Sequence, residues 1–126
     1  MGGIMASTQN QLKSIVNELR SSDTINAAAV IRRDGVLMAS NLPSDFAEKD
    51  VFAMMSATIL GAAKKISTKH ALGLPSRIIV ETHEGNIVIS GAGTQALLVC
   101  LVEDGTEGSV LWEAIDAAEN KVKGLL

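Results

Sequence analysis

A long predicted helix constrains the fold of this chain most strongly, because it carries apolar residues on two opposite sides. Ser44 or Asp45 is a suitable N-cap for it, and Gly73 is a suitable end. Acidic residues gather at its start and basic residues near its end, as the helix dipole favours. Steps of three and four define one side, which we expect to cover a sheet. That side holds Val51, Phe52, Met55, Ile59, Ala62, Ala63 and Ile66.

The opposite side of this helix is also apolar. It holds Ala53, Met54, Ala57, Leu60 and Gly61, before Lys64 and Lys65. Ala53, Ala57 and Gly61 recur every four residues and form a ridge of small residues that lets another backbone approach closely. A helix with two apolar sides must bury both. The ridge therefore predicts a helix partner, which is either the same helix of a second subunit across a twofold axis or another helix of this chain.

The remaining elements predict an α/β domain of the α+β sandwich type, with a five-stranded, mainly antiparallel sheet and helices on both faces. Helical periodicity marks residues 9–20 and 109–122. Strands are expected at 27–31 and 36–40, joined by an Asp34-Gly35 hairpin turn, and at 77–82, 86–90 and 95–102. The last strand is the most apolar and is predicted to be central in the sheet.

The strand over 77–82 is expected at a sheet edge, with Arg77, Ile79 and Glu81 on one side of it. An apolar edge is a template for further pairing unless it is covered. Two readings stay open: the edge pairs with a second copy across a twofold axis, or its charged residues protect it.

Length and composition indicate a single globular domain over residues 9–126, after a flexible N-terminus over 1–8. The net charge of −3 and an aromatic content of 2% argue against nucleic-acid binding. The longest apolar run, over 96–102, is too short to cross a bilayer, so no membrane insertion is expected. Cys100 is the single cysteine, which excludes an internal disulfide and favours a reducing, cytoplasmic setting.

The candidate chemical motifs predict no enzyme, no cofactor and no metal site. The stretch from Gly91 to Ala96 matches the G-x-G-x-x-G/A pattern of a dinucleotide fingerprint. A strand pattern follows where the fingerprint needs a helix, so a hairpin turn is expected. His70 and His83 lack the further ligands that zinc requires. Cys100 lies in an apolar run, where a thiol is inert.

Taken together, the pattern resembles the Roadblock domain family, which includes roadblock-type dynein light chains and MglB-like regulators. The hairpin over 27–40, the long helix rich in small residues, the meander over 77–102 and the helix that Gly108 opens carry the likeness. The resemblance implies a longin-like or profilin-like fold in the order α-β-β-α-β-β-β-α. It also implies a dimer joined at the third strand and the long helix. The residues expected there are Ala53, Met54, Ala57, Leu60, Gly61, Lys64, Arg77, Ile79 and Glu81.

The function that the resemblance implies is that of a non-catalytic homodimeric adaptor or regulator, which binds a small Ras-like GTPase and modulates or scaffolds it. The alternative is a ligand-sensing domain, or a structural adaptor in a larger signalling or motor complex. The ligand-sensing reading is favoured by the Gly91-Ala92-Gly93 turn with Asp104 and Glu107 nearby in sequence.

Overall fold

The computed structural model describes residues 2–104 and 108–126, with side chains from residue 7 onward. Its elements are α1 (Gly2–Arg20), β1 (Ile25–Arg32), β2 (Leu37–Ser40), α2 (Lys49–Lys69), β3 (Arg77–Thr82), β4 (Gly85–Ala92), β5 (Ala96–Val102) and α3 (Ser109–Leu125). This order confirms the predicted α-β-β-α-β-β-β-α arrangement. The helix α1 runs across residue 9, the predicted start of the domain.

The five strands form one antiparallel sheet in the order β2-β1-β5-β4-β3. The apolar β5 is central and β3 is an edge, as predicted. The hairpin between β1 and β2 closes where the Gly35 N–H donates to the Arg32 carbonyl at 2.8 Å. Gly35 has a φ of +96°, which a side chain would disfavour, whereas Asp34 keeps a negative φ.

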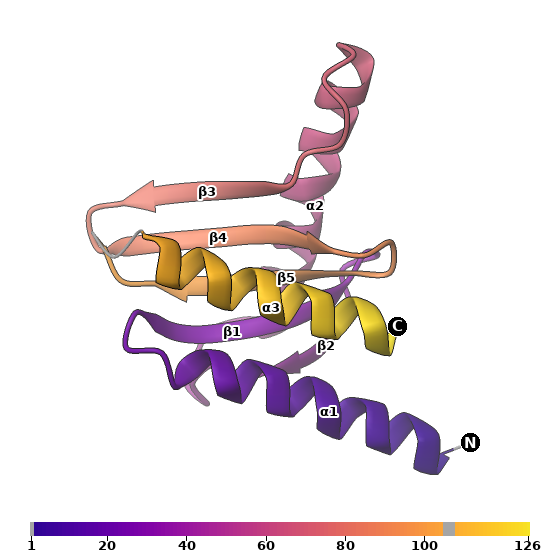
Figure 1. Ribbon diagram of the computed structural model, residues 1–126, viewed down its shortest axis with the longest axis vertical. Coiled ribbons are helices and arrows are strands. Elements are labelled where there is room, and N and C mark those ends of the chain that lie inside the picture. The colour runs from indigo at the N-terminus through magenta and orange to yellow at the C-terminus, as the bar shows by residue number, and fades with distance from the viewer. Residues whose placement is uncertain (1, 105–107) are drawn as a thin grey trace.

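Helices cover both faces of this sheet. Figure 1 shows α1 and α3 in front of the sheet and α2 behind it. The core under α1 and α3 includes Leu12, Val16, Leu98, Leu111 and Ile115. A second, smaller core lies between the sheet and α2, and it includes Ile31, Ile89, Leu97 and Val99.

Most of the predicted core side of α2 does not face the sheet, although Phe52, which was predicted there, does pack against the second core. Ala53 and Leu60 are buried against the sheet, while Met55 and Ile66, predicted to be in the core, are exposed. The physical reason is volume. The strands already contribute large side chains to this layer, and the small Ala53 and Ser56 let the helix lie close to them, with Leu60 packed in the same layer. Neither α1 nor α3 covers the ridge of small residues, because both lie on the other face of the sheet.

The ends of α2 also differ from the prediction. The helix begins at Lys49 rather than near Ser44 or Asp45, and Glu48 precedes it with a φ of +50°. The delay follows from Phe46, whose N–H donates to the Pro43 carbonyl at 3.0 Å and whose ring packs edge-on against Phe52. This turn places the Phe46 ring at the second core before the helix can start.

At its other end α2 stops at Lys69, before the predicted Gly73. Ala71 already adopts a left-handed φ of +58°, and the Leu72 N–H donates back to the Ser67 carbonyl at 2.8 Å. In α3, Leu111, Ile115, Ala118 and Val122 are buried as expected, whereas Val110 is 73% exposed and does not belong to the core side.

Candidate partner interface

An apolar stripe runs along the exposed side of α2. We define the α2 stripe as Val51, Met55, Ile59, Ala62 and Ile66, which follow one another at steps of three and four residues. Met55 is 56% exposed and Ile66 62%. Monomeric proteins rarely leave large apolar side chains contiguous on their surface, so such a stripe indicates an interaction site.

The C-terminal part of α2 projects past the edge of the sheet. Figure 1 shows its upper end extending beyond β3, with the following loop returning along it to the start of β3. Ile66, Leu72 and Leu74 belong to this overhang and are each more than 60% exposed. In the part of the chain that the structure describes, no strand lies beneath the overhang, which leaves Ile66 and Leu72 exposed, whereas Leu74 lines a pocket with Leu60 and Pro75.

The edge strand β3 lies directly beside the overhang. The Gly91 N–H donates to the Ser76 carbonyl, and the register from Arg77↔Ser90 to Thr82↔Gly85 is unbroken. Backbone groups alternate in an antiparallel pair, so Arg77, Ile79 and Glu81 direct their N–H and C=O groups away from β4. The edge therefore offers a row of unpaired backbone donors and acceptors, and Ile79 adds an apolar side chain that is 38% exposed.

The side chain of Arg77 is occupied within the chain. Its Nη2 atom lies 2.6 Å from Asp116 Oδ1 and 3.3 Å from Glu119 Oε2 on α3. Its guanidinium also lies 4.7 Å from the Trp112 ring centroid. Burial raises the pKa of Glu119, and the nearby Arg77 opposes that rise. Arg77 thus connects the edge strand to α3, a role that the predicted interface did not foresee.

The structure separates the predicted interface residues into two groups. Ala53 and Leu60 are buried under the chain's own sheet and Ala57 is half-buried there, so these three do not form an exposed surface. Met54, Gly61, Lys64, Ile79 and Glu81 are exposed. The α2 stripe was missed as a surface because larger apolar side chains were assigned to the core. The small size of the ridge residues is the signal that favours a close fit to a sheet.

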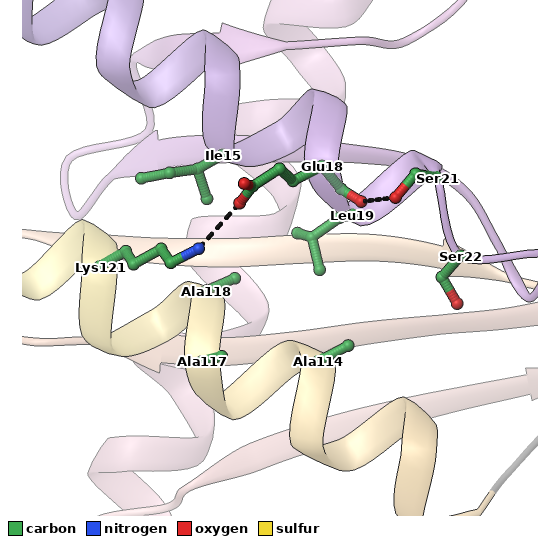
Figure 2. A pocket seen from close by; sticks show the side chains of 9 residues that line it. All are labelled: Ile15, Glu18, Leu19, Ser21, Ser22, Ala114, Ala117, Ala118 and Lys121. Carbon is green, nitrogen blue, oxygen red and sulfur yellow. Dashed lines mark hydrogen bonds and ion pairs between the residues drawn. The ribbon is translucent and has the colours of Figure 1, made fainter.

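A second surface lies between α1 and α3. Figure 2 shows Ile15 and Leu19 of α1 directed toward Ala114 and Ala118 of α3, around a cavity of about 330 Å³. An ion pair bridges the two helices, with Lys121 Nζ 2.8 Å from Glu18 Oε2. Both of its side chains are more than half exposed, so it contributes little to stability.

The remaining motifs behave as local structure. The stretch from Gly91 to Ala96 joins the end of β4 to the start of β5 through a turn over residues 93–95, so a strand and not a helix follows it, as expected. Cys100 is fully buried, and burial raises its pKa to about 12, which makes its thiol unreactive. Asp104 is exposed after β5, while Glu107 lies outside the described residues. Among the described residues, no three His, Cys, Asp or Glu side chains group as metal ligands would.

In the described part of the chain, every helix is too short or too polar to span a bilayer.

Sequence comparison identifies related proteins over most of the chain. The family model described as the Roadblock/LC7 domain matches residues 12–102. The uncharacterized protein MJ0714 of Methanocaldococcus jannaschii is 26% identical over 117 residues, which cover 93% of this chain and 98% of that protein.

Solved structures share the fold at low sequence identity. MglB of Myxococcus xanthus superposes with a TM-score of 0.84 at 12% identity, over 90% of this chain and 93% of that one. A structure described as MglB with tetrameric arrangement gives a TM-score of 0.82 at 15% identity, over 94% and 89%. Profilin IA of Acanthamoeba castellanii gives 0.64 at 13% identity, over 89% and 96%. These likenesses agree with the expected profilin-like arrangement.

Proposed function

The chain belongs to the Roadblock/LC7 domain family, and from that premise we propose that it is a non-catalytic homodimeric adaptor, which binds a small Ras-like GTPase and modulates or scaffolds it. The observation that carries the proposal is the exposed α2 stripe beside the open edge of β3. The two surfaces are adjacent. In the described chain the stripe has no apolar side chains packed on it, and the outer edge of β3 has no strand that pairs with its backbone N–H and C=O groups.

A twofold axis near Ile79 satisfies both surfaces at once. Two antiparallel copies of β3 then pair through Arg77, Ile79 and Glu81, and each Arg77 comes opposite Glu81 of the second copy. The joined sheets place strands of the second copy under the overhang, where Leu74 gains an apolar support. The two α2 helices pack by their stripes, which makes the contact isologous.

The assembly part of the proposal is supported by a structurally similar protein, since one of the MglB structures is described as tetrameric. The GTPase part rests on the resemblance to MglB-like regulators of the family. We place the protein in the cytoplasm, because its single cysteine is buried and unpaired, as a reducing compartment permits.

The dimer is tested by the mass in solution, measured by light scattering at micromolar concentration. We expect the native chain at about twice the 13.2 kDa of one copy. Met55→Arg places a charge in the stripe, and Ile79→Pro removes one outward N–H without touching the ladder to β4, so both variants are expected to be monomers. Asn17→Arg, which adds the same charge to the exposed side of α1, and Ile79→Thr, which keeps the N–H, are the controls and should remain dimers.

A native monomer contradicts the dimer. If both Met55→Arg and Ile79→Pro remain dimers, the contact lies on another surface. The groove between α1 and α3 is then the next candidate.

The GTPase part is tested separately with Ras-like GTPases of the source organism. We expect at least one of them to be retained by the immobilised native chain and to change its rate of GTP turnover when the chain is added. The monomeric variants show whether the dimer is required. If no such GTPase binds or changes its turnover, the regulator role is lost while the dimer can still stand.

A further inference from the structure

A pocket of about 380 Å³ lies where the β1–β2 turn, the β4–β5 turn and the loop between α2 and β3 meet α2. Its lining combines two cations, Arg33 and Lys64, a hydroxyl from Thr94, and an apolar wall of Leu60, Leu74 and Pro75. No carboxylate is part of this lining. The volume falls within the range of about 300–1,000 Å³ that is usual for small-molecule sites.

The positive charge of this pocket is not neutralised within the described chain. Arg33 Nη2 donates to the Gly93 carbonyl at 2.7 Å, which orients the guanidinium and leaves its other donors available. The neighbouring carboxylate, Asp34, is engaged by Arg32 at 2.7 Å, and this pairing lowers the pKa of Asp34. Two uncompensated cations in one pocket are notable on a chain whose net charge is −3.

The glycine-rich turn creates the room for this arrangement. A Cβ atom at Gly91 would lie 2.8 Å from Arg33 Nη2, and Gly93 has a φ of +76°. The absence of a side chain at Gly91 leaves the guanidinium of Arg33 room to lie against this turn, and the positive φ of Gly93 favours glycine there. The stretch from Gly91 to Ala96, which matches the dinucleotide-fingerprint pattern, therefore makes room for a cation beside a hairpin turn. The helix that a fingerprint requires does not follow it.

We propose that this pocket binds a small organic oxyanion, a carboxylate or a phosphate monoester, whose charge lies between Arg33 and Lys64. The hydrocarbon part of the ligand packs against Leu74 and Pro75, and Thr94 offers a further hydrogen bond. Lys64 follows Met55 by about two and a half helical turns, so the pocket opens on the flank of α2 opposite the α2 stripe. The pocket shares Leu74 with the overhang, whereas its two cations, Arg33 and Lys64, lie outside the α2 stripe.

The proposal is tested by titrating the native chain with phenyl phosphate and with phenylacetate, which share an aromatic body and differ in the oxyanion. Amide chemical shifts report binding at Gly93, Thr94 and Leu74. We expect saturable shifts at these residues with at least one probe, and the better probe identifies the oxyanion. Inorganic phosphate, which has no hydrocarbon part, should bind more weakly.

Three variants locate the site. Arg33→Ala and Lys64→Ala each remove a charged hydrogen-bond donor and should weaken binding about tenfold or more. Gly91→Ala keeps both cations but places a Cβ atom 2.8 Å from Arg33 Nη2, so the end of the guanidinium must shift and binding should weaken less than in Arg33→Ala. Lys65→Ala is the matched control, because Lys65 neighbours Lys64 on α2 and does not line the pocket, and it should bind as the native chain does.

The absence of saturable shifts with both probes at millimolar concentration overturns the proposal. So does unchanged binding in both Arg33→Ala and Lys64→Ala, with folding checked from the rest of each spectrum. Inorganic phosphate binding as tightly as phenyl phosphate would mean that the pocket attracts an adventitious ion only.

Discussion

At the residue scale, Asn41 connects three segments of the chain through one buried amide. Its Oδ1 accepts the Ala28 N–H at 2.6 Å, and its Nδ2 donates to the Val16 carbonyl at 2.7 Å. Ala28 and Val16 are fully buried in β1 and α1, and Asn41 itself is 7% exposed. The amide therefore satisfies backbone groups that water cannot reach.

Replacing this amide leaves the Ala28 N–H without a partner in the core. We expect Asn41→Ala to lower the free energy of unfolding by about 2 kcal/mol, the usual cost of an unsatisfied buried donor. Urea denaturation measures the loss. Asn17→Ala, an exposed change in α1, should stay within about 0.5 kcal/mol of the native chain. Equal losses for both variants would show that the buried bonds of Asn41 add nothing.

The sequence identifies Asn41 only as part of a loop, because its partners lie 13 and 25 residues away. A local pattern carries no information about a polar contact at that separation. Cys100 is the contrasting residue: its apolar neighbours in sequence are enough to predict its burial, which the structure confirms. Burial is thus readable at this scale, whereas the partners of a buried polar group are not.

At the scale of elements, Arg77 fixes α3 to the edge strand β3. Without its cation, Glu119, whose side chain is 17% exposed, would keep a charge in a poorly solvated place. We expect Arg77→Leu to lower the free energy of unfolding by about 2 kcal/mol at pH 7. Lys121→Leu breaks the exposed pair between α3 and α1 instead, and should cost less than about 1 kcal/mol.

The loss in Arg77→Leu should depend on pH. Burial raises the pKa of Glu119 in the folded chain above its ordinary value of 4.5, and removing Arg77 removes an influence that lowers it. The folded state then binds more protons than the unfolded state, so stability falls as pH rises from about 4.5 through the raised pKa. Below that window Glu119 is protonated in both states and this part of the loss disappears.

Urea titrations from acidic to neutral pH test this dependence. Adding Glu119→Gln to Arg77→Leu should remove the extra slope, since no carboxylate is left to titrate at that position. A loss that stays constant across the pH range would assign the effect of Arg77 to packing on Trp112 alone.

Element-scale prediction succeeded for order and failed for orientation. The hairpin at Asp34-Gly35 and the apolar character of β5 are local signals, and both led to the correct strand positions. The side of α2 that faces the sheet depends instead on how much volume the strands leave free, which the periodicity of the helix does not report. Both sides of α2 carry apolar residues, and the side with Ala53, Ser56 and Leu60 is buried whereas the side with Met55 is exposed.

At the scale of the whole molecule, the candidate surfaces follow from the position of α2 on the sheet. The sequence predicts a helix that needs two partners and an edge strand that needs one. It does not predict the overhang, because the crossing point of a helix on a sheet is set by packing. The pocket with Arg33 and Lys64 could likewise not be predicted from the sequence, because α2 and three connecting segments that are distant in the sequence form it together.

The overhang leads to a prediction about local stability. In a single copy, the amides of residues 66–74 lie in a segment with little apolar support, so they should exchange with solvent far faster than those of β5. Dimerisation through β3 places a second sheet beneath this segment. We therefore expect amide exchange over 66–74 to slow as the protein concentration rises, while exchange in β5 stays constant. Ile79→Pro should abolish the concentration dependence, and Ile79→Thr should keep it. Exchange over 66–74 that is slow at every concentration, or that responds equally in both variants, would mean that the overhang is stabilised within one copy and does not need a second.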